Sequence, residues 1–87
     1  MNRDVAIIIV AYNSARHLDA CLRSVFSQCR EVTQEVIVLD NGSTDTTVAL
    51  VRERFPDVKL LIAGRNLGFA AGVNLAAQHA KADYLLL

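Results

Sequence analysis

Three pairs of polar or aromatic residues have the greatest potential for chemistry, and each pair lies at or just past the end of an apolar run. The pairs are Tyr12-Asn13, Asp40-Asn41 and Arg65-Asn66. If the runs are parallel strands, their carboxyl ends meet at one edge of a sheet, where open α/β sheets bind ligands. A ring, a carboxylate and a cation there could stack on a base, accept its imide N–H and meet a phosphate. Asp40 alone is equally consistent with turn chemistry, so the interpretation depends on the convergence.

The apolar runs and the helical patterns between them must position these pairs. Val36 to Leu39 is a continuous apolar run, typical of a strand buried on both faces, and the chain then turns into helix-cap residues. Strands are expected over residues 5–11, 35–40, 58–62 and 82–87. Helices are expected from a cap at Asn13 or Ser14 to about Arg30, from a cap at Ser43 or Thr44 to Pro56, and from Phe69 to Ala80.

Strand and helix alternate three times, which predicts an α/β fold with right-handed crossovers. We expect a Rossmann-like three-layer α/β/α arrangement with a parallel sheet of about four strands. A three-strand, flavodoxin-like arrangement fits the pattern almost as well. Residues 1–87 form a single domain in this interpretation, and the apolar segment 83–87 has no terminator, which suggests a truncated chain.

The residues in the turns argue against two other classes of α/β protein, dinucleotide-binding domains and phospho-acceptor receiver domains. The first strand-helix turn, residues 12–15, has no glycine, and Gly64, Gly68 and Gly72 have the wrong spacing for a dinucleotide fingerprint. A phospho-acceptor receiver domain would carry an acidic pair after the first strand and an Asp after the third, but Asn13 and Arg65 lie near those positions.

Composition narrows the choice of partners further. Nine basic and nine acidic residues give a net charge of zero, which removes the whole-domain electrostatic argument for nucleic acid. No apolar run is long enough to cross a bilayer, and the first apolar run lacks a signal-peptide cleavage site. Cys21 and Cys29 are expected to be buried free thiols on the apolar side of the first helix.

Five further residues have simpler interpretations than a functional one. His17 is expected to be solvated, His79 to lie near a helix end that favours a cation, and Asp45 to begin a helix. Phe69 and Tyr84 are interpreted as packing residues, although Phe69 could also cover a ligand.

The chain resembles the N-terminal half of a family 2 glycosyltransferase. Three blocks match in order and spacing: Ala11-Tyr12-Asn13, the turn from Asp40 to Asp45 (Asp-Asn-Gly-Ser-Thr-Asp), and the segment from Arg65 to Asn74 (Arg-Asn-Leu-Gly-Phe-Ala-Ala-Gly-Val-Asn). The resemblance covers essentially all 87 residues. It implies the N-terminal part of a GT-A fold and an inverting enzyme with a nucleotide-sugar donor.

The resemblance also implies roles for eight residues in binding the nucleotide sugar. Ala11 and Tyr12 would line the base with Asn13 beside them, and Asp40 would accept the N3–H of uracil or thymine. Asn41 would lie near the base or ribose. The remaining three would lie near the ribose and diphosphate: Arg65, Asn66 and Gly72. The third block is similar to the rhamnosyltransferase-like branch, which points to dTDP-rhamnose as donor.

The family's acidic metal-binding motif and catalytic base would follow the last strand and are absent from these residues. We therefore expect Mg or Mn in the full-length enzyme, no metal bound by the residues present, and no turnover by this fragment. The resemblance also implies a saccharide or lipid-linked acceptor and a role in polysaccharide or cell-envelope glycan synthesis. It implies a cytoplasmic location, with the full-length protein peripheral at the inner face of the membrane. The exposed terminal strand is expected to promote self-association. The alternative is a non-catalytic nucleotide-binding or structural α/β module.

Overall fold

A parallel sheet forms the centre of the molecule. The computed structural model describes residues 5–28, 34–80 and 84–86. The strands are β1 (Val5–Ala11), β2 (Gln34–Asp40), β3 (Lys59–Ile62) and β4 (Tyr84–Leu86), and they pair in the order β3-β2-β1-β4. Every pair is parallel. The predicted α/β class with a parallel sheet is confirmed.

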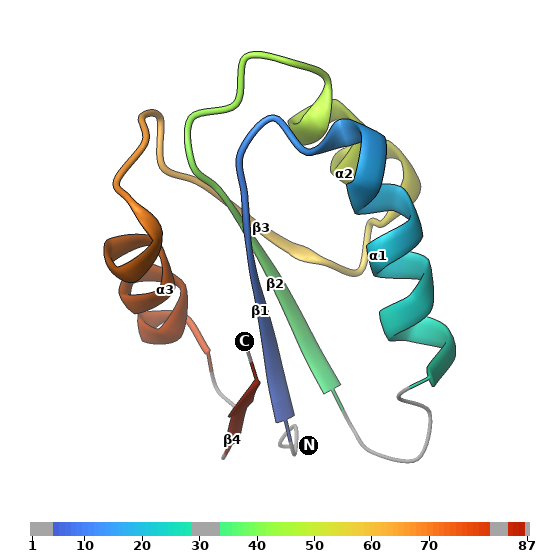
Figure 1. Ribbon diagram of the computed structural model, residues 1–87. Coiled ribbons are helices and arrows are strands. Elements are labelled where there is room, and N and C mark those ends of the chain that lie inside the picture. Colours follow the sequence, from blue (N-terminus) through green and yellow to red (C-terminus); the bar gives the residue numbers. More distant parts are fainter. Residues whose placement is uncertain (1–4, 29–33, 81–83, 87) are drawn as a thin grey trace.

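Helices cover both faces of this sheet. Helices α1 (Ala15–Gln28) and α2 (Thr47–Arg54) lie on one face, and α3 (Phe69–Gln78) lies on the other (Figure 1). Successive strand residues point to opposite faces, so β2 contributes to two apolar layers. Val36 and Val38 pack with α1 and α2, whereas Ile37 and Leu39 pack with α3. The molecule therefore has the three layers that the alternation predicts.

Small residues bring α3 close to the sheet. Gly72 and Ala76 are the buried residues of this helix. A Cβ built on Gly72 would lie 2.9 Å from a methyl carbon of Leu39 and 3.4 Å from one of Val10. The two small buried residues thus allow the close packing of this helix on the sheet.

The start of α2 differs from the expectation. The helix begins at Thr47 after Thr46, whose side chain makes no capping bond, so neither Ser43 nor Thr44 caps it and Asp45 precedes it. The reason is that Ser43 Oγ and the N–H groups of Thr44 and Asp45 are bonded to Asn13 in the loop after β1, while the Asp45 carboxylate accepts Thr47 N–H at the helix start. The other end agrees with the prediction, because α2 ends at Arg54, two residues before Pro56.

Two side chains predicted to be buried are exposed. Cys21 is an exposed free thiol, because the buried stripe of α1 is narrow, with Leu18 and Leu22 as its fully buried members. Phe69 is 67% exposed at the start of α3, so its packing role is wrong. Cys29 and the side chain of Tyr84 lie outside the described part of the chain.

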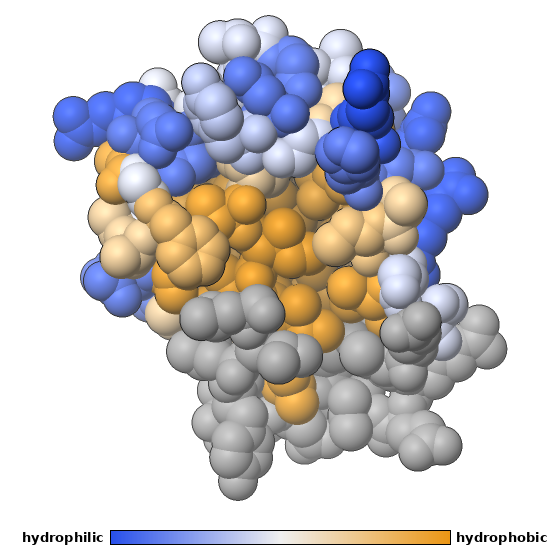
Figure 2. All heavy atoms as spheres, in the orientation of Figure 1, coloured by the Kyte–Doolittle hydropathy of each residue, from blue (hydrophilic) through white to orange (hydrophobic). Residues whose placement is uncertain are grey.

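Figure 2 shows how polarity is distributed on one face of the molecule. Hydrophilic residues gather over the top of the view, where the loops after the strands lie, and apolar residues fill the centre. In the described segments 5–28, 34–80 and 84–86, the helices are too short or too polar to cross a membrane.

Candidate functional site

The carboxyl ends of three strands lie side by side. Ala11 of β1 is level with Asp40 of β2, and Asp40 is level with Ile62 of β3. The pairing continues one step further: Asn41 N–H donates to the Ala11 carbonyl at 2.7 Å, and Ala63 N–H donates to the Asp40 carbonyl at 2.9 Å. The loops that follow, residues 12–14, 41–46 and 63–68, therefore gather at one end of the sheet (Figure 1). The predicted convergence of the three polar pairs at one edge is what the geometry shows.

Asp40 is buried with one carboxylate oxygen unpaired. Its side chain is on the α1–α2 side, and the residue is only 2% exposed. Oδ2 accepts a hydrogen bond from Ser43 N–H at 3.1 Å. Oδ1 is buried and has no hydrogen-bond partner among the described residues. A buried acceptor without a donor costs free energy, so this oxygen would gain from a ligand that brings an N–H or O–H.

Asn13 binds the neighbouring loop. Its backbone has a positive φ of 48°, a conformation that Asn tolerates better than most residues. Its N–H donates to Ser43 Oγ at 2.8 Å, and its side-chain Oδ1 accepts the N–H groups of Thr44 at 2.8 Å and Asp45 at 3.3 Å. The side chain of Asn13 is thus used to join the loop after β1 to the loop after β2, and it does not cap α1.

Asp45 and Thr47 complete this joint. Asp45 Oδ2 accepts Ala15 N–H at 3.3 Å, and Asp45 Oδ1 accepts Thr47 N–H at 2.9 Å as well as the Thr47 hydroxyl. Thr47 Oγ1 in turn accepts Ser14 N–H at 3.0 Å. The hydrogen bond from the Thr47 side chain, with further bonds from backbone N–H groups, lowers the pKa of Asp45 below its ordinary value. The first turns of α1 and α2 are therefore held together by one exposed carboxylate and one buried hydroxyl.

Asn41 holds the third loop. The residue is 3% exposed. Its Oδ1 accepts Leu67 N–H at 2.7 Å, and its Nδ2 donates to the Gly68 carbonyl at 3.1 Å. Both polar atoms of the side chain are thus bonded to the loop between β3 and α3.

Arg65 and Asn66 lie on that loop and are exposed. Their backbone packs against Gly42, whose φ is +89°: a Cβ there would lie 2.8 Å from the Arg65 carbonyl carbon and 2.9 Å from Asn66 N. Asn66 Oδ1 accepts Gly68 N–H at 2.8 Å, which shapes the turn into α3. Among the described residues, the exposed Arg65 side chain forms no ion pair.

The last three predicted site residues differ in how accessible they are to a ligand. Tyr12 is half exposed directly after β1, so its ring can meet a ligand. Ala11 is buried beside Asp40, and its carbonyl is bonded to Asn41. Gly72 is a buried residue of α3, on the side of the helix that faces the sheet and the Asn41 side chain. A direct contact between Gly72 and a nucleotide stays a prediction.

Sequence reasoning missed Gly42, Ser43 and Thr47 as parts of this site. Thr47 is fully buried although it lies at a helix start, and its partners are far away in the sequence. Gly42 carried a signal, since a glycine in a turn after a strand indicates a positive φ or a close approach.

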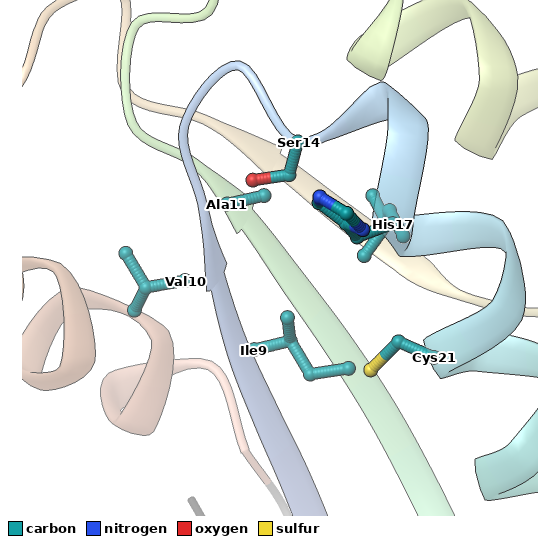
Figure 3. A pocket seen from close by; sticks show the side chains of 7 residues that line it. Ile9, Val10, Ala11, Ser14, His17 and Cys21 are labelled. Carbon is teal, nitrogen blue, oxygen red and sulfur yellow. The ribbon is translucent and has the colours of Figure 1, made fainter.

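A separate apolar pocket of about 190 Å³ lies beside this edge, between β1 and α1 (Figure 3). Its lining includes Ile9, Ser14, His17 and Cys21. Asp40 and Arg65 do not line it. In Figure 3 the Val10 side chain points away from it, toward α3. Within the described part of the chain, no three His, Cys, Asp or Glu side chains are grouped so that they could hold a metal ion.

A parallel sheet with polar loops gathered at its carboxyl edge defines the class: a Rossmann-like α/β domain, the N-terminal part of a GT-A fold. The profile of the family described as Glycosyl transferase family 2 matches residues 6–87, and the chain belongs to that family.

Relatives support this assignment. The N-acetylglucosaminyl-diphospho-decaprenol L-rhamnosyltransferase of Mycobacterium tuberculosis is 40% identical over 68 residues, which are 78% of this chain and 22% of that protein. Staphylococcus aureus TarS 1–349 superposes with a TM-score of 0.84 at 26% identity, over 95% of this chain and 26% of that one. A mannosyltransferase from Pyrobaculum calidifontis, solved with GDP-Man and Mn²⁺, superposes with a TM-score of 0.75 at 32% identity. The match covers 92% of this chain and 25% of the mannosyltransferase. The chain thus spans about a quarter of these proteins.

Proposed function

We propose that this chain is the nucleotide-sugar-binding part of a glycosyltransferase that transfers its sugar with inversion. The observation that carries the proposal is the buried, unpaired Oδ1 of Asp40 at the carboxyl edge of the sheet. Imide N–H groups of bases are neutral donors that suit such an acceptor, and a charge-assisted bond of this kind is stronger than a neutral one. The family membership supports a sugar donor.

The base specificity follows from the acceptor. Uracil and thymine present a donor at N3, whereas cytosine presents an acceptor there, which would repel a carboxylate. The half-exposed Tyr12 ring offers a surface on which the base can stack. Guanine also carries a ring N–H, and the Pyrobaculum calidifontis neighbour was solved with GDP-Man. A choice between uracil, thymine and guanine is therefore part of the test.

Arg65 would meet the diphosphate, since it is exposed on the loop that packs against Gly42. Asn66 would lie beside it. A dTDP-rhamnose donor is supported by the Mycobacterium tuberculosis relative, whose name makes it a rhamnosyltransferase, and a saccharide or lipid-linked acceptor by its diphospho-decaprenol substrate. Such an acceptor fits cell-envelope glycan synthesis, with the enzyme cytoplasmic and peripheral at the inner face of the membrane.

The reaction would be a direct displacement at the anomeric carbon, with a carboxylate that takes the proton of the acceptor hydroxyl. In the longer relatives most of the chain lies outside the matched region, and we assign the base and a divalent cation, Mg or Mn, to that remainder. The described residues contain no group that fits such an ion. They bind and orient the donor, and we expect no turnover from them alone.

Calorimetry with UDP, dTDP, GDP and CDP tests the proposal. UDP or dTDP should bind more tightly than CDP, and Asp40→Ala should weaken the preferred nucleotide by about 1 to 3 kcal/mol because a charge-assisted bond is lost. The matched control is Asp57→Ala, which removes an exposed carboxylate from the turn after α2. Unchanged affinity in a folded Asp40→Ala variant would remove Asp40 from the site.

A non-catalytic binding or structural module remains the alternative. It keeps Asp40 as a turn residue through its bond from Ser43. Failure of all four nucleotides to bind the wild-type chain would favour the structural module, whereas nucleotide binding without sugar transfer by the longer protein would favour a non-catalytic nucleotide-binding module.

A further inference from the structure

The side-chain amide of Asn41 pairs with the backbone of the β3–α3 loop through two hydrogen bonds. Its amide accepts from one peptide unit and donates to the next, at Leu67 and Gly68. The Gly68 carbonyl also accepts Gly72 N–H at 3.1 Å, the first hydrogen bond of α3. One buried amide therefore secures both the end of the β3–α3 loop and the start of the helix.

The backbone of the same loop also packs against Gly42, at Arg65 and Asn66. The Arg65 and Asn66 backbone occupies the space where a side chain at position 42 would lie, with distances of 2.8 to 3.0 Å to a Cβ built there. Residues 41 and 42 thus contact the loop from 65 to 68 at both ends.

Asp40 and Asn41 are neighbours that serve opposite faces. Asp40 lies on the α1–α2 side with an unpaired oxygen, and Asn41 lies on the α3 side with both polar atoms bonded. The bonds of Asn41 therefore connect the end of the strand that carries Asp40 with the loop that carries Arg65.

We propose that Asn41 is a positioning residue: it holds the loop so that Arg65 meets the diphosphate of a nucleotide whose base is bound at Asp40. This inference rests on the proposed function. The family resemblance places Asn41 near the base or ribose, and we give it an indirect role there because the residue is 3% exposed and both polar atoms of its side chain are bonded to the loop.

The first test needs no ligand and uses amide hydrogen exchange measured by NMR. Asn41→Ala removes the acceptor of Leu67 N–H, so exchange at Leu67 should accelerate about tenfold or more, and by a larger factor than exchange at core amides such as Ile37, which report global unfolding. Asn41→Asp keeps the shape and the acceptor, so Leu67 should retain more protection than in the alanine variant. Equal protection of Leu67 in wild type and Asn41→Ala would overturn the inference.

The second test is a double-mutant cycle on binding of UDP and of uridine, with dTDP and thymidine used if that base is preferred. Arg65→Ala should weaken the diphosphate about tenfold and leave the nucleoside unchanged, because only the phosphate contact is lost. Asn41→Ala should give the same pattern, and the double variant should be no weaker than either single one. Gln78→Ala, an exposed amide at the end of α3, is the matched control and should match wild type.

The outcomes separate this inference from the proposed function. If wild type binds no nucleotide, the proposed function fails. If wild type binds but Asn41→Ala weakens nucleoside and diphosphate equally, or the two substitutions multiply, the positioning role is wrong and the site stands. Should Asn41→Ala not fold, Asn41→Ser, whose hydroxyl is too short to reach both peptide units, takes its place in the cycle.

Discussion

At the residue scale, the segment from Asp40 to Asp45 is held in place by side chains that are remote in sequence. Asn13 binds two of its N–H groups, and Asp45 binds Ala15 and Thr47. These bonds satisfy polar groups of the loops that would otherwise be open to hydrogen-bond with a ligand. The edge is therefore pre-arranged, with Asp40 Oδ1 left as its buried free acceptor.

Asp45 should make stability depend on pH. The Thr47 side-chain bond lowers its pKa in the folded chain, so the carboxylate stabilises the fold above the ordinary value of 3.8 and this contribution is lost as the pH falls through the lowered pKa. Asp45→Asn should unfold at lower urea concentration than wild type at pH 7, and the difference should shrink below pH 3.8. Urea titrations across this range measure it.

Asp57→Asn serves as the control, since Asp57 is an exposed carboxylate in the turn before β3. A constant difference between wild type and Asp45→Asn at every pH would contradict the assigned cause.

Gly42 and Gly64 offer a matched pair of substitutions. Both have positive φ, +89° and +81°, but a Cβ on Gly42 would collide with the Arg65–Asn66 backbone, whereas Gly64 has open space around it. Each alanine variant should lose about 1 to 2 kcal/mol from backbone strain. Gly42→Ala should lose more, because backbone must also shift. Chemical denaturation that ranks the two variants equally would argue against the close approach.

The sequence indicated the positions of Asp40, Tyr12 and Arg65 at one edge, since strand ends can be located from apolar runs. It could not reveal that Asn13 and Asn41 bind loops, because their partners are 31 and 26 residues away in the chain. Side-chain hydrogen bonds between loops depend on packing that no periodicity records.

At the element scale, Thr47 joins the starts of two helices. Its buried hydroxyl accepts Ser14 N–H and donates to Asp45. Thr47→Val has nearly the same shape but leaves Ser14 N–H without its acceptor, so we expect a loss of about 1 to 3 kcal/mol in the free energy of unfolding. Thermal and urea unfolding measure the loss.

Thr47→Ser keeps the hydroxyl and is the control for this change. The serine variant should be more stable than the valine variant, and a valine variant as stable as wild type would contradict the stabilising role of the hydroxyl bridge.

The hydrophobic periodicity of the sequence predicted where the helices and strands lie better than it predicted where they begin and end. The runs that predicted β1 and β2 were close to the observed bounds, and Pro56 correctly limited α2. The predicted start of α2 and the predicted burial of Cys21 were wrong. Helix starts depend on where capping groups are used, and Ser43, Thr44 and Asp45 are used by the β1 loop.

At the scale of the whole molecule, β4 forms the end of the sheet beside β1. Its three described residues pair with Val5, Ala6 and Ile7, so the rest of β1 has no strand on that side in the described part of the chain. Unpaired strand edges with apolar residues invite pairing between molecules. Light scattering should show self-association that increases with protein concentration, and a strictly monomeric species at high concentration would contradict this.

The central claim is that Asp40 Oδ1 accepts the N3–H of a uracil or thymine base, and a base analogue tests it most directly. The affinities of UDP and of its N3-methyl analogue should be compared by calorimetry, in wild type and in Asp40→Ala. The account predicts that the methyl group weakens wild-type binding about tenfold or more, because it replaces the donor with bulk, and that the preference disappears in Asp40→Ala. Equal affinity of wild type for both nucleotides would contradict it.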